Sequence, residues 1–201
     1  MPTTTDVIDT LAGIAPGSRL DTIRTLRAEA RKHAQMSYLS LFEPASLGSV
    51  TAPERFAVAA FVAGLHGRPE TNDFYAKGLA SSGASAALQA AVAAAVAAAR
   101  TTGPYGSYPK GPLTVENTAG LLYKVAPDTA KGLGTRLTAA FEHVHMLVFH
   151  PRDAAAPSLQ SLLDAGWSTT DVVTLSQLVS FLAFQIRVVA GLRTLAPKLS
   201  A

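Results

Sequence analysis

The chain has 201 residues, of which 48% are hydrophobic and 15% are charged, and this balance excludes the disordered class. Its length fits one compact domain, residues 1–201, or two small halves that share a core. The lack of cysteine excludes disulfide bonds, thiolate nucleophiles and thiolate metal ligands. The net charge is +3 and the basic residues are scattered, whereas a nucleic-acid-binding protein usually has a dense basic face. We therefore expect no nucleic-acid partner.

The N-terminal sequence does not combine a basic region with an apolar run, so no secretory signal is expected. No window of about 18 residues is continuously apolar, and the nearest approach, residues 172–186, contains serine, threonine and glutamine. We therefore expect a cytoplasmic protein that has no membrane partner. The low share of charged residues also predicts that some apolar surface is covered in a homo-oligomer.

Helix signals dominate the sequence, and the expected fold class is all-α. A serine or threonine followed three residues later by an acid is typical of a helix N-terminus, because each side chain can cap a backbone amide of the other residue. This pattern precedes an apolar-periodic run at Ser18 and Asp21, at Thr51 and Glu54, and at Ser168 and Asp171. The expected helices cover residues 18–40, 52–66, 70–81, 84–100, 114–125, 128–150, 158–165 and 168–195.

Proline and glycine mark expected helix ends. Pro151 is expected to end the helix that precedes it. Gly166 fits the position just after a helix C-terminus. An interruption is expected near Pro127, Gly132 and Gly134.

One clear loop divides the chain near its middle. Residues 101–113 are rich in glycine, proline and tyrosine, and they join the halves 1–100 and 114–201. Residues 51–61 and 168–178 share a capping pattern and an apolar spacing but not residue identities, which indicates either a weak internal repeat or two similar helix starts.

Residues 142–150 hold three of the five histidines of the chain. On a helix, His143 and His150 are seven residues apart and lie on one face. Glu142 and His145 are three residues apart and are also neighbours. A carboxylate beside an imidazole can fix its tautomer and raise its basicity. These four residues are therefore the candidate catalytic residues, and we expect them to line a small pocket that binds a small molecule.

Three interpretations of this segment remain open. In the first, Glu142 and His145 act as base and orienter in proton transfer on a small carbonyl or lactone-like substrate. In the second, His143, His150 and one carboxylate bind a single metal ion; a di-iron site would need a second Glu-x-x-His pair and two more glutamates. In the third, the histidines lie at the edge of the core or at a subunit contact and hydrogen-bond to the backbone. We assign no cofactor and no metal ligand.

Other basic residues also need partners. Arg24, Arg27 and Arg31 share one helix face, which is either solvated or holds an anionic ligand or the carboxylates of a partner. His66 ends an expected helix and is interpreted as a cation near a helix C-terminus. Arg187 lies among apolar residues of the last helix, and we expect it to have a charged partner.

Two runs resemble a known superfamily. They are Thr51-Ala-Pro-Glu-Arg-Phe-Ala-Val-Ala-Ala-Phe-Val-Ala-Gly64 and Leu163-Asp-Ala-Gly-Trp-Ser-Thr-Thr-Asp-Val-Val-Thr-Leu-Ser-Gln-Leu-Val-Ser-Phe-Leu-Ala-Phe-Gln-Ile-Arg-Val-Val-Ala-Gly191. Both resemble the alkylhydroperoxidase D-like, carboxymuconolactone decarboxylase superfamily. Residues 142–153 resemble an uncharacterised subgroup named for its carboxymuconolactone decarboxylase-type domain. The resemblance spans about residues 45 to 195 and implies an all-helical domain that assembles into dimers, trimers or hexamers.

The peroxidase branch of this superfamily reduces hydroperoxides through a glutamate, a Cys-x-x-Cys motif and histidines. When that motif is aligned on Glu54, its cysteines fall at His66 and Pro69 and its histidines at Arg68 and Asp73. Only the glutamate matches, so the resemblance does not extend to thiol peroxidase activity. The decarboxylase branch uses neither thiol nor cofactor. We therefore expect a carboxymuconolactone decarboxylase-like lyase of unknown substrate, and the alternative is a non-catalytic oligomeric companion of a cysteine-bearing peroxidase relative.

Overall fold

The computed structural model of the chain describes residues 5–200. Within this range the chain forms nine α-helices, two short 3-10 helices and no β-strand, which confirms the predicted all-α class. Helix content alone does not establish an alkylhydroperoxidase D-like domain. The helices are α1 (Val7–Ala12), α2 (Arg19–Thr25), α3 (Ala28–Phe42), α4 (Ala52–Leu65), α5 (Pro69–Ser81), α6 (Ala86–Ala99), η1 (Pro112–Glu116), α7 (Pro127–Phe149), η2 (Pro151–Asp153), α8 (Ala156–Asp164) and α9 (Thr169–Ser200).

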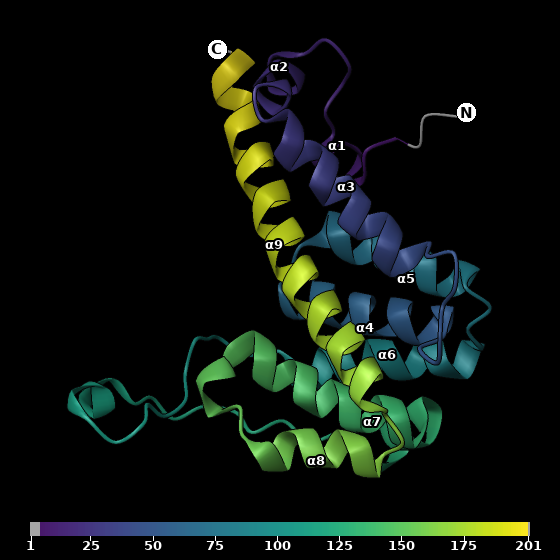
Figure 1. Cartoon of the computed structure of the whole chain (residues 1–201), viewed down its shortest axis with the longest axis vertical. Coiled ribbons are helices and arrows are strands. Elements are labelled where there is room, and N and C mark those ends of the chain that lie inside the picture. Colours follow the sequence, from purple (N-terminus) through teal and green to yellow (C-terminus); the bar gives the residue numbers. More distant parts are fainter. Residues whose placement is uncertain (1–4, 201) are drawn as a thin grey trace.

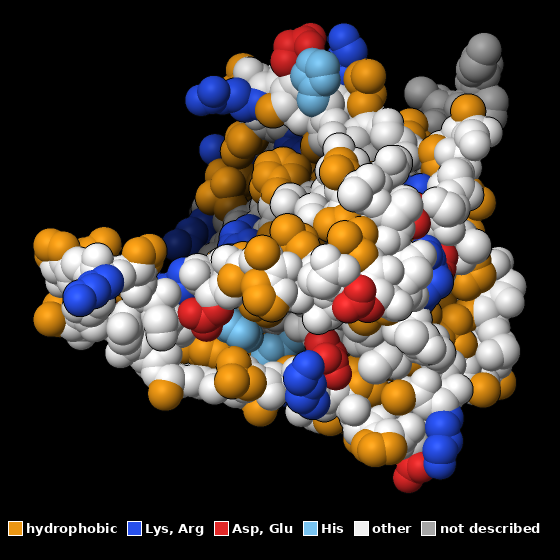
Figure 2. All heavy atoms as spheres, turned by 60° about the horizontal axis from the view of Figure 1, so that its bottom comes forward, with side chains coloured by type: hydrophobic (Ala, Val, Ile, Leu, Met, Phe, Trp, Pro, Cys, Tyr) orange, Lys and Arg blue, Asp and Glu red, His pale blue; other side chains and the backbone are white. Residues whose placement is uncertain are grey.

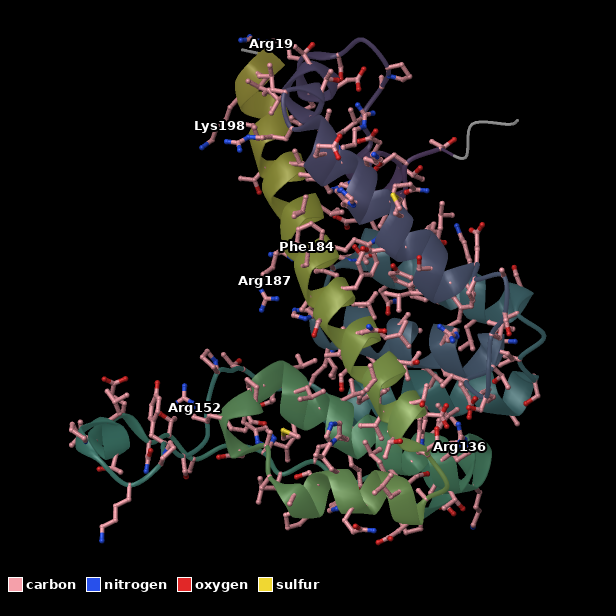
Figure 3. The ribbon with its side chains drawn as sticks, viewed as in Figure 1. Arg19, Arg136, Arg152, Phe184, Arg187 and Lys198 are labelled. Carbon is pink, nitrogen blue, oxygen red and sulfur yellow. The ribbon has the colours of Figure 1, made fainter. Side chains whose placement is uncertain are left out.

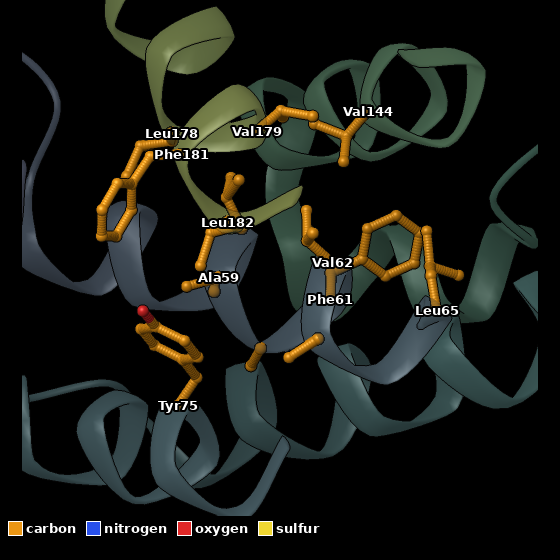
Figure 4. Close-up of a cluster of buried hydrophobic side chains, with 14 of the residues drawn as sticks. Ala59, Phe61, Val62, Leu65, Tyr75, Val144, Leu178, Val179, Phe181 and Leu182 are labelled. Carbon is orange, nitrogen blue, oxygen red and sulfur yellow. The ribbon is translucent and has the colours of Figure 1, made fainter. Parts of the chain in front are cut away.

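Helix α4 lies at the centre of the fold and packs against α5, α6, α7 and α9 (Figure 1). From its second turn onward its residues are buried, and they are mostly alanine, valine and phenylalanine. Figure 4 shows Val62 of α4 in one cluster with Val144 of α7 and Leu182 of α9. The rings of Phe61 and Phe141 stack with centroids 4.1 Å apart. Burial of these side chains supplies the main stabilisation of the fold and fixes α7, which carries the histidines, against α4.

All three sequence patterns for helix N-termini lie where helices begin. At α4, the Thr51 hydroxyl accepts from the Glu54 amide (3.3 Å) and the Glu54 carboxylate accepts from the Thr51 amide (2.8 Å). Ser168 and Asp171 form the same two hydrogen bonds at α9 (3.1 and 3.0 Å). At α2 the Ser18 hydroxyl accepts from the Asp21 amide, but the Asp21 carboxylate accepts from the amide of Gly17 and not from that of Ser18. Only half of the capping box therefore forms.

Arg136 on α7 joins the two complete capping boxes. Its guanidinium donates to Glu54 (2.8 Å), lies 3.7 Å from Asp171, and stacks over the Trp167 ring at 4.4 Å. Figure 3 shows Arg136 where α7 meets the start of α9. The acids that cap α4 and α9, far apart in the sequence, therefore share one cation. The internal repeat stays a prediction, although its two helix starts meet in space.

The predicted helix at 114–125 is wrong, since only η1 forms there. The chain runs without helical structure past the Tyr105 ring at Gly120, where a Cβ would overlap that ring. Further on, the Val125 amide donates to a carboxylate of α7 instead of to a helical carbonyl. The segment also contains Asn117, Gly120 and several β-branched residues, which are weak helix formers, so both its composition and these tertiary contacts oppose a helix.

Residues 106–122 instead form an arm that projects from the body of the protein (Figure 1, lower left). Its base is closed by two backbone hydrogen bonds between Gly106 and Thr118, of 2.8 and 3.2 Å. The Tyr108 amide donates to the side chain of Asn117 at 2.7 Å. The helix η1 forms the tip of the arm.

The predicted helix at 18–40 is interrupted at Arg27, and α1 precedes it in the chain. Arg24 of α2 and Arg31 of α3 both pair with Asp9 of α1. On one straight helix these arginines would be about 10 Å apart along the axis, so the bend allows both to reach one carboxylate. The idea of a solvated stripe, or of an outside anion, is therefore wrong for Arg24 and Arg31, whose acids belong to this chain.

Glycine and proline largely act as predicted. Gly134 adopts φ 74° and breaks α7, whereas Pro127 is the first residue of that helix and not an interruption. Helix α7 ends two residues before Pro151. Gly166 adopts φ 89° in a Schellman turn after α8.

Helix α9 continues to Ser200, beyond the predicted end at residue 195. Among residues 5–200 it is the one helix long and apolar enough to cross a membrane, and 44% of its apolar window is buried in the protein. Because a buried core helix passes the same test, the lack of a membrane partner stays a prediction. Arg187 is exposed, and its hydrogen bond goes to the Ala183 carbonyl of its own helix (2.8 Å). The charged partner expected for Arg187 is not found within the described part of the chain.

Candidate functional site

A cavity of about 380 Å³ lies where the second half of α7 faces η2, the start of α8 and residues 122–124. In Figure 2, histidine side chains are recessed in a hollow between acidic and apolar side chains. Glu142, His143 and His150 line the cavity, whereas His145 does not. The structure therefore brings three of the four candidate residues to one pocket.

His143 lies one heptad before His150, and both side chains line the cavity, as their spacing predicts. The imidazole of His143 is buried, and its Nδ1 has no hydrogen-bond partner in the described structure. Burial lowers the pKa of His143, and a hydrogen bond with the backbone of Ser158 partly offsets this shift. His143 is therefore neutral at neutral pH. An unpaired buried nitrogen beside a cavity is a candidate contact for a polar ligand.

His150 and Asp153 form the carboxylate–imidazole pair of the cavity. Asp153 Oδ2 lies 2.9 Å from His150 Nδ1. The Ser107 amide donates to Asp153 Oδ1 at 2.7 Å, and this hydrogen bond is the largest cause that lowers the pKa of Asp153. The hydrogen bond and the charge of His150 lower this pKa further. The carboxylate is therefore ionised at neutral pH and keeps a proton on Nδ1, which leaves Nε2 as a proton acceptor. Nε2 has no hydrogen-bond partner among residues 5–200.

The residues that precede the arm hold the His150 ring in place. The Tyr105 ring stacks on the imidazole with centroids 4.9 Å apart and 18° between the planes. The Tyr105 hydroxyl donates to the Leu121 carbonyl at 2.6 Å. Burial raises the pKa of Tyr105, and the charge of Asp153 adds to this shift, so the hydroxyl stays protonated. His150 is thus oriented at one edge by a carboxylate and on one face by an aromatic ring.

Glu142 does not pair with His145, in contrast to the first interpretation. Its Oε1 accepts from the Val125 amide at 3.1 Å, and its Oε2 pairs with the Lys124 ammonium at 2.5 Å. Both oxygens of Glu142 are therefore engaged. This carboxylate holds one wall of the cavity against α7 and places the charge of Lys124 at that wall.

His145 does not line the cavity and serves the fold: it is fully buried, and its ring lies behind the cavity residue His150, with the ring centroids 5.8 Å apart. Its Nε2 lies 3.1 Å from the carbonyl oxygen of Ala99, the last residue of α6. Its ring packs against Tyr123 and Phe149, with centroids 5.1 and 4.9 Å away. Burial lowers the pKa of His145 to about 4, the charge of His150 adds to this shift, and the bond to Ala99 opposes it. A neutral His145 therefore donates to the Ala99 carbonyl, which has no partner within α6. For this residue the structure agrees with the third interpretation, a histidine that hydrogen-bonds to the backbone.

His66 is also neutral, so its interpretation as a cation at a helix C-terminus is wrong. It is the C-cap residue of α4. Burial lowers its pKa, and the nearby charges of Arg187 and Arg68 lower it further.

Asp153 and Lys124 are the residues of the site that sequence reasoning missed. Asp153 follows His150 by three positions across Pro151, which starts a short 3-10 helix. Side chains at i and i+3 eclipse in such a helix, so the spacing His150-Pro-Arg-Asp153 was the available signal. Lys124 has no comparable signal, because it lies in the segment predicted to be helical.

The described side chains do not form a metal site. Among residues 5–200, no group of three histidine or acidic side chains is arranged to hold a metal ion. The carboxylate nearest to the two cavity histidines, that of Asp153, is instead hydrogen-bonded to a ring nitrogen. The second interpretation of the segment therefore has no ligand set to support it.

Comparison of the chain with protein-family models, with curated proteins and with solved structures gives no match. The resemblance to the alkylhydroperoxidase D-like superfamily therefore stays a prediction that rests on the two runs quoted above.

Proposed function

We propose that the chain is a cofactor-free enzyme that moves a proton on a small carbonyl or lactone compound. In this proposal His150 is the base and Asp153 is its positioning residue. The observation that carries the proposal is the 2.9 Å contact between the Asp153 carboxylate and His150 Nδ1, beside a cavity of about 380 Å³. A carboxylate that accepts the Nδ1 proton leaves Nε2 basic and can stabilise the imidazolium that forms during proton transfer.

The other residues of the cavity suit such a reaction. Its volume lies near the lower end of small-molecule sites, and Leu122 and Met146 supply apolar wall. When Nε2 removes a proton next to a carbonyl group, negative charge develops on the carbonyl oxygen, and a hydrogen-bond donor or cation at that oxygen would stabilise it. Lys124 lines the cavity, and its ammonium would supply this charge by exchanging its ion pair with Glu142 for the substrate oxygen. The proton held by His150 then returns to a carbon atom of the product. This chemistry fits the decarboxylase branch that the sequence resembles, and a lyase reaction remains our expectation.

The test measures proton exchange at carbon. A panel of small ketones, keto acids and lactones is incubated with the protein in heavy water, and deuterium uptake next to the carbonyl group is followed by NMR. We expect His150→Gln to abolish the protein-dependent uptake and Asp153→Asn to reduce it at least tenfold. His33→Gln is the matched control, because His33 is an exposed imidazole far from the cavity. Thermal shift with the same panel shows whether the variants still bind.

Two outcomes would contradict the proposal. In one, the wild type neither binds any compound of the panel nor exchanges its protons. In the other, exchange persists in His150→Gln and is lost in His33→Gln, which would show that a surface imidazole is responsible.

The second candidate is a non-catalytic companion that assembles with itself or with a cysteine-bearing relative. The observation that favours it is the exposed apolar arm, since such a surface is typical of an interaction site. An inactive cavity in a protein that still assembles would support this candidate. For both candidates, a cytoplasmic location remains our expectation.

A further inference from the structure

Large apolar side chains are exposed at several places, and two of these places are the arm and the groove between α3 and α9. At the tip of the arm, Val115 is 87% exposed and Leu113 is also exposed. On the body, Phe184 is 47% exposed and, with Met36 and Phe181, it lines a groove of about 600 Å³ between α3 and α9. Exposed apolar surface of this extent marks an interaction site.

The arm is preorganised for contact with a partner. Its base is closed by the hydrogen bonds between Gly106 and Thr118, and the Arg152 guanidinium stacks on the Tyr108 ring at 4.1 Å. A rigid arm loses little conformational entropy when it docks, which favours binding through the tip.

Each surface also carries charged side chains that make no ion pair within residues 5–200: Lys110 and Glu116 on the arm, and Arg187 on α9. Arg187 follows Phe184 by three positions, so both lie on one face of α9. In Figure 3 the Arg187 side chain points to the side on which the arm projects. Of the two charged side chains on the arm, Glu116 directly follows the apolar Val115 and is opposite in sign to Arg187 beside the groove.

We propose that two copies of the chain form a symmetric dimer in which each arm docks into the groove between α3 and α9 of the other copy. Figure 1 shows the arm and α9 as two sides of an open angle. A two-fold axis through this angle carries the arm tip of one copy onto the middle of α9 in its partner, and the reverse contact follows by symmetry. In this arrangement Val115 packs beside Phe184 of the partner subunit, and Glu116 pairs with Arg187 of the partner subunit. The arm tip and the groove belong to the same chain, so one second copy covers both surfaces in a single symmetric interface.

The dimer also bears on the candidate site, although it does not depend on the proposed reaction. Leu122 at the base of the arm lines the cavity, and Ser107 donates to Asp153. Docking of the arm tip would hold both contacts in one position. The proposed dimer can therefore exist whether or not the cavity is catalytic.

The first experiment is sedimentation velocity of the purified full-length chain. We expect the wild type to have twice the monomer mass of 20.9 kDa, and Val115→Asp and Phe184→Asp each to be monomeric. Leu26→Asp is the matched control, because Leu26 is 77% exposed but lies outside the arm and the groove. Circular dichroism establishes that each variant is folded. A monomeric wild type, or a dimer that persists in both arm and groove variants, overturns the proposal.

A charge-swap series then tests the pairing itself. Glu116→Arg and Arg187→Glu alone should each weaken dimerisation about tenfold, which is the size of one interfacial ion pair. The double variant should recover most of the wild-type affinity, because the pair is restored with its signs exchanged. A double variant that is weaker than both single variants would overturn the arm-to-groove arrangement.

Discussion

His145 makes the stability of the protein depend on pH in a way that can be worked out from the structure. The pKa of its buried imidazole falls from 6.5 to about 4 in the folded state. The unfolded chain therefore binds a proton between these two pH values while the folded chain does not. Because the folded pKa is the lower one, the contribution of His145 is fully present above pH 6.5 and is lost as the pH falls towards 4. Between pH 7 and pH 5 this loss amounts to about 2 kcal/mol.

The variant His145→Gln isolates this contribution, because glutamine can still donate to the Ala99 carbonyl but does not titrate. The assay is urea unfolding at pH 7 and at pH 5, for wild type and variant. We expect the variant to be somewhat less stable at pH 7, through the loss of ring packing against Phe149. Its fall in unfolding free energy between the two pH values should be smaller than that of the wild type by about 2 kcal/mol. An equal fall in both proteins would refute the burial of a neutral His145.

Two further predictions concern single contacts. Arg136→Ala should lower the free energy of unfolding by about 3 kcal/mol, or the melting temperature by roughly 6–12 °C, because the variant loses a charge-assisted hydrogen bond and a cation–π contact. Arg152→Ala is the control, because Arg152 also stacks on an aromatic ring but bonds to no carboxylate in the described part of the chain, and it should lower the free energy of unfolding by less than about 1 kcal/mol. If calorimetry shows that both variants lose the same stability, the role given to Arg136 is wrong. Gly120→Ala should destabilise the protein by about 1–3 kcal/mol in thermal unfolding, because the added methyl group overlaps the Tyr105 ring. Gly111→Ala, near the arm tip, should be close to neutral, because the nearest atom to an added Cβ is the Pro109 carbonyl oxygen at an ordinary contact distance of 3.8 Å.

The predictions that the structure confirms rest on local and periodic signals in the sequence. The capping pairs at Thr51 and Ser168 depend on residues within one helical turn, so their hydrogen bonds follow from the sequence alone. The same holds for the helix breaks at Gly134 and Gly166, where the backbone adopts positive φ. The all-α class follows from such signals because each of them marks a helix end.

The predictions that failed concern segments whose conformation depends on contacts with distant parts of the chain. The predicted helix at 114–125 did not form: the backbone passes the Tyr105 ring at Gly120, and the Val125 amide bonds to Glu142. Nothing within the segment marks these contacts, because both partners lie elsewhere in the chain. The helix bend at Arg27 likewise reflects an acid on α1.

The sequence predicted where the candidate site lies, but it did not predict which residues pair within it. Helical spacing correctly placed His143 and His150 on one face. It could not show that His145 points to the end of α6, since the direction of burial depends on which helix packs there. It also favoured a neighbour on the same helix, Glu142, as the carboxylate partner. The residue that bonds to a cavity histidine, Asp153, lies beyond the helix end.

The position of Arg136 has a consequence for any attempt to divide the chain. Its guanidinium completes a bridge between the first turn of α4 and the first turn of α9. A polypeptide that stops at residue 113 keeps Glu54 but has lost this cation. A polypeptide that begins at residue 114 keeps the cation and only one of its two acids. Neither fragment should reach the full helix content alone, whereas a mixture of the two should regain it, so a cut within the arm would be tolerated only while both pieces stay together.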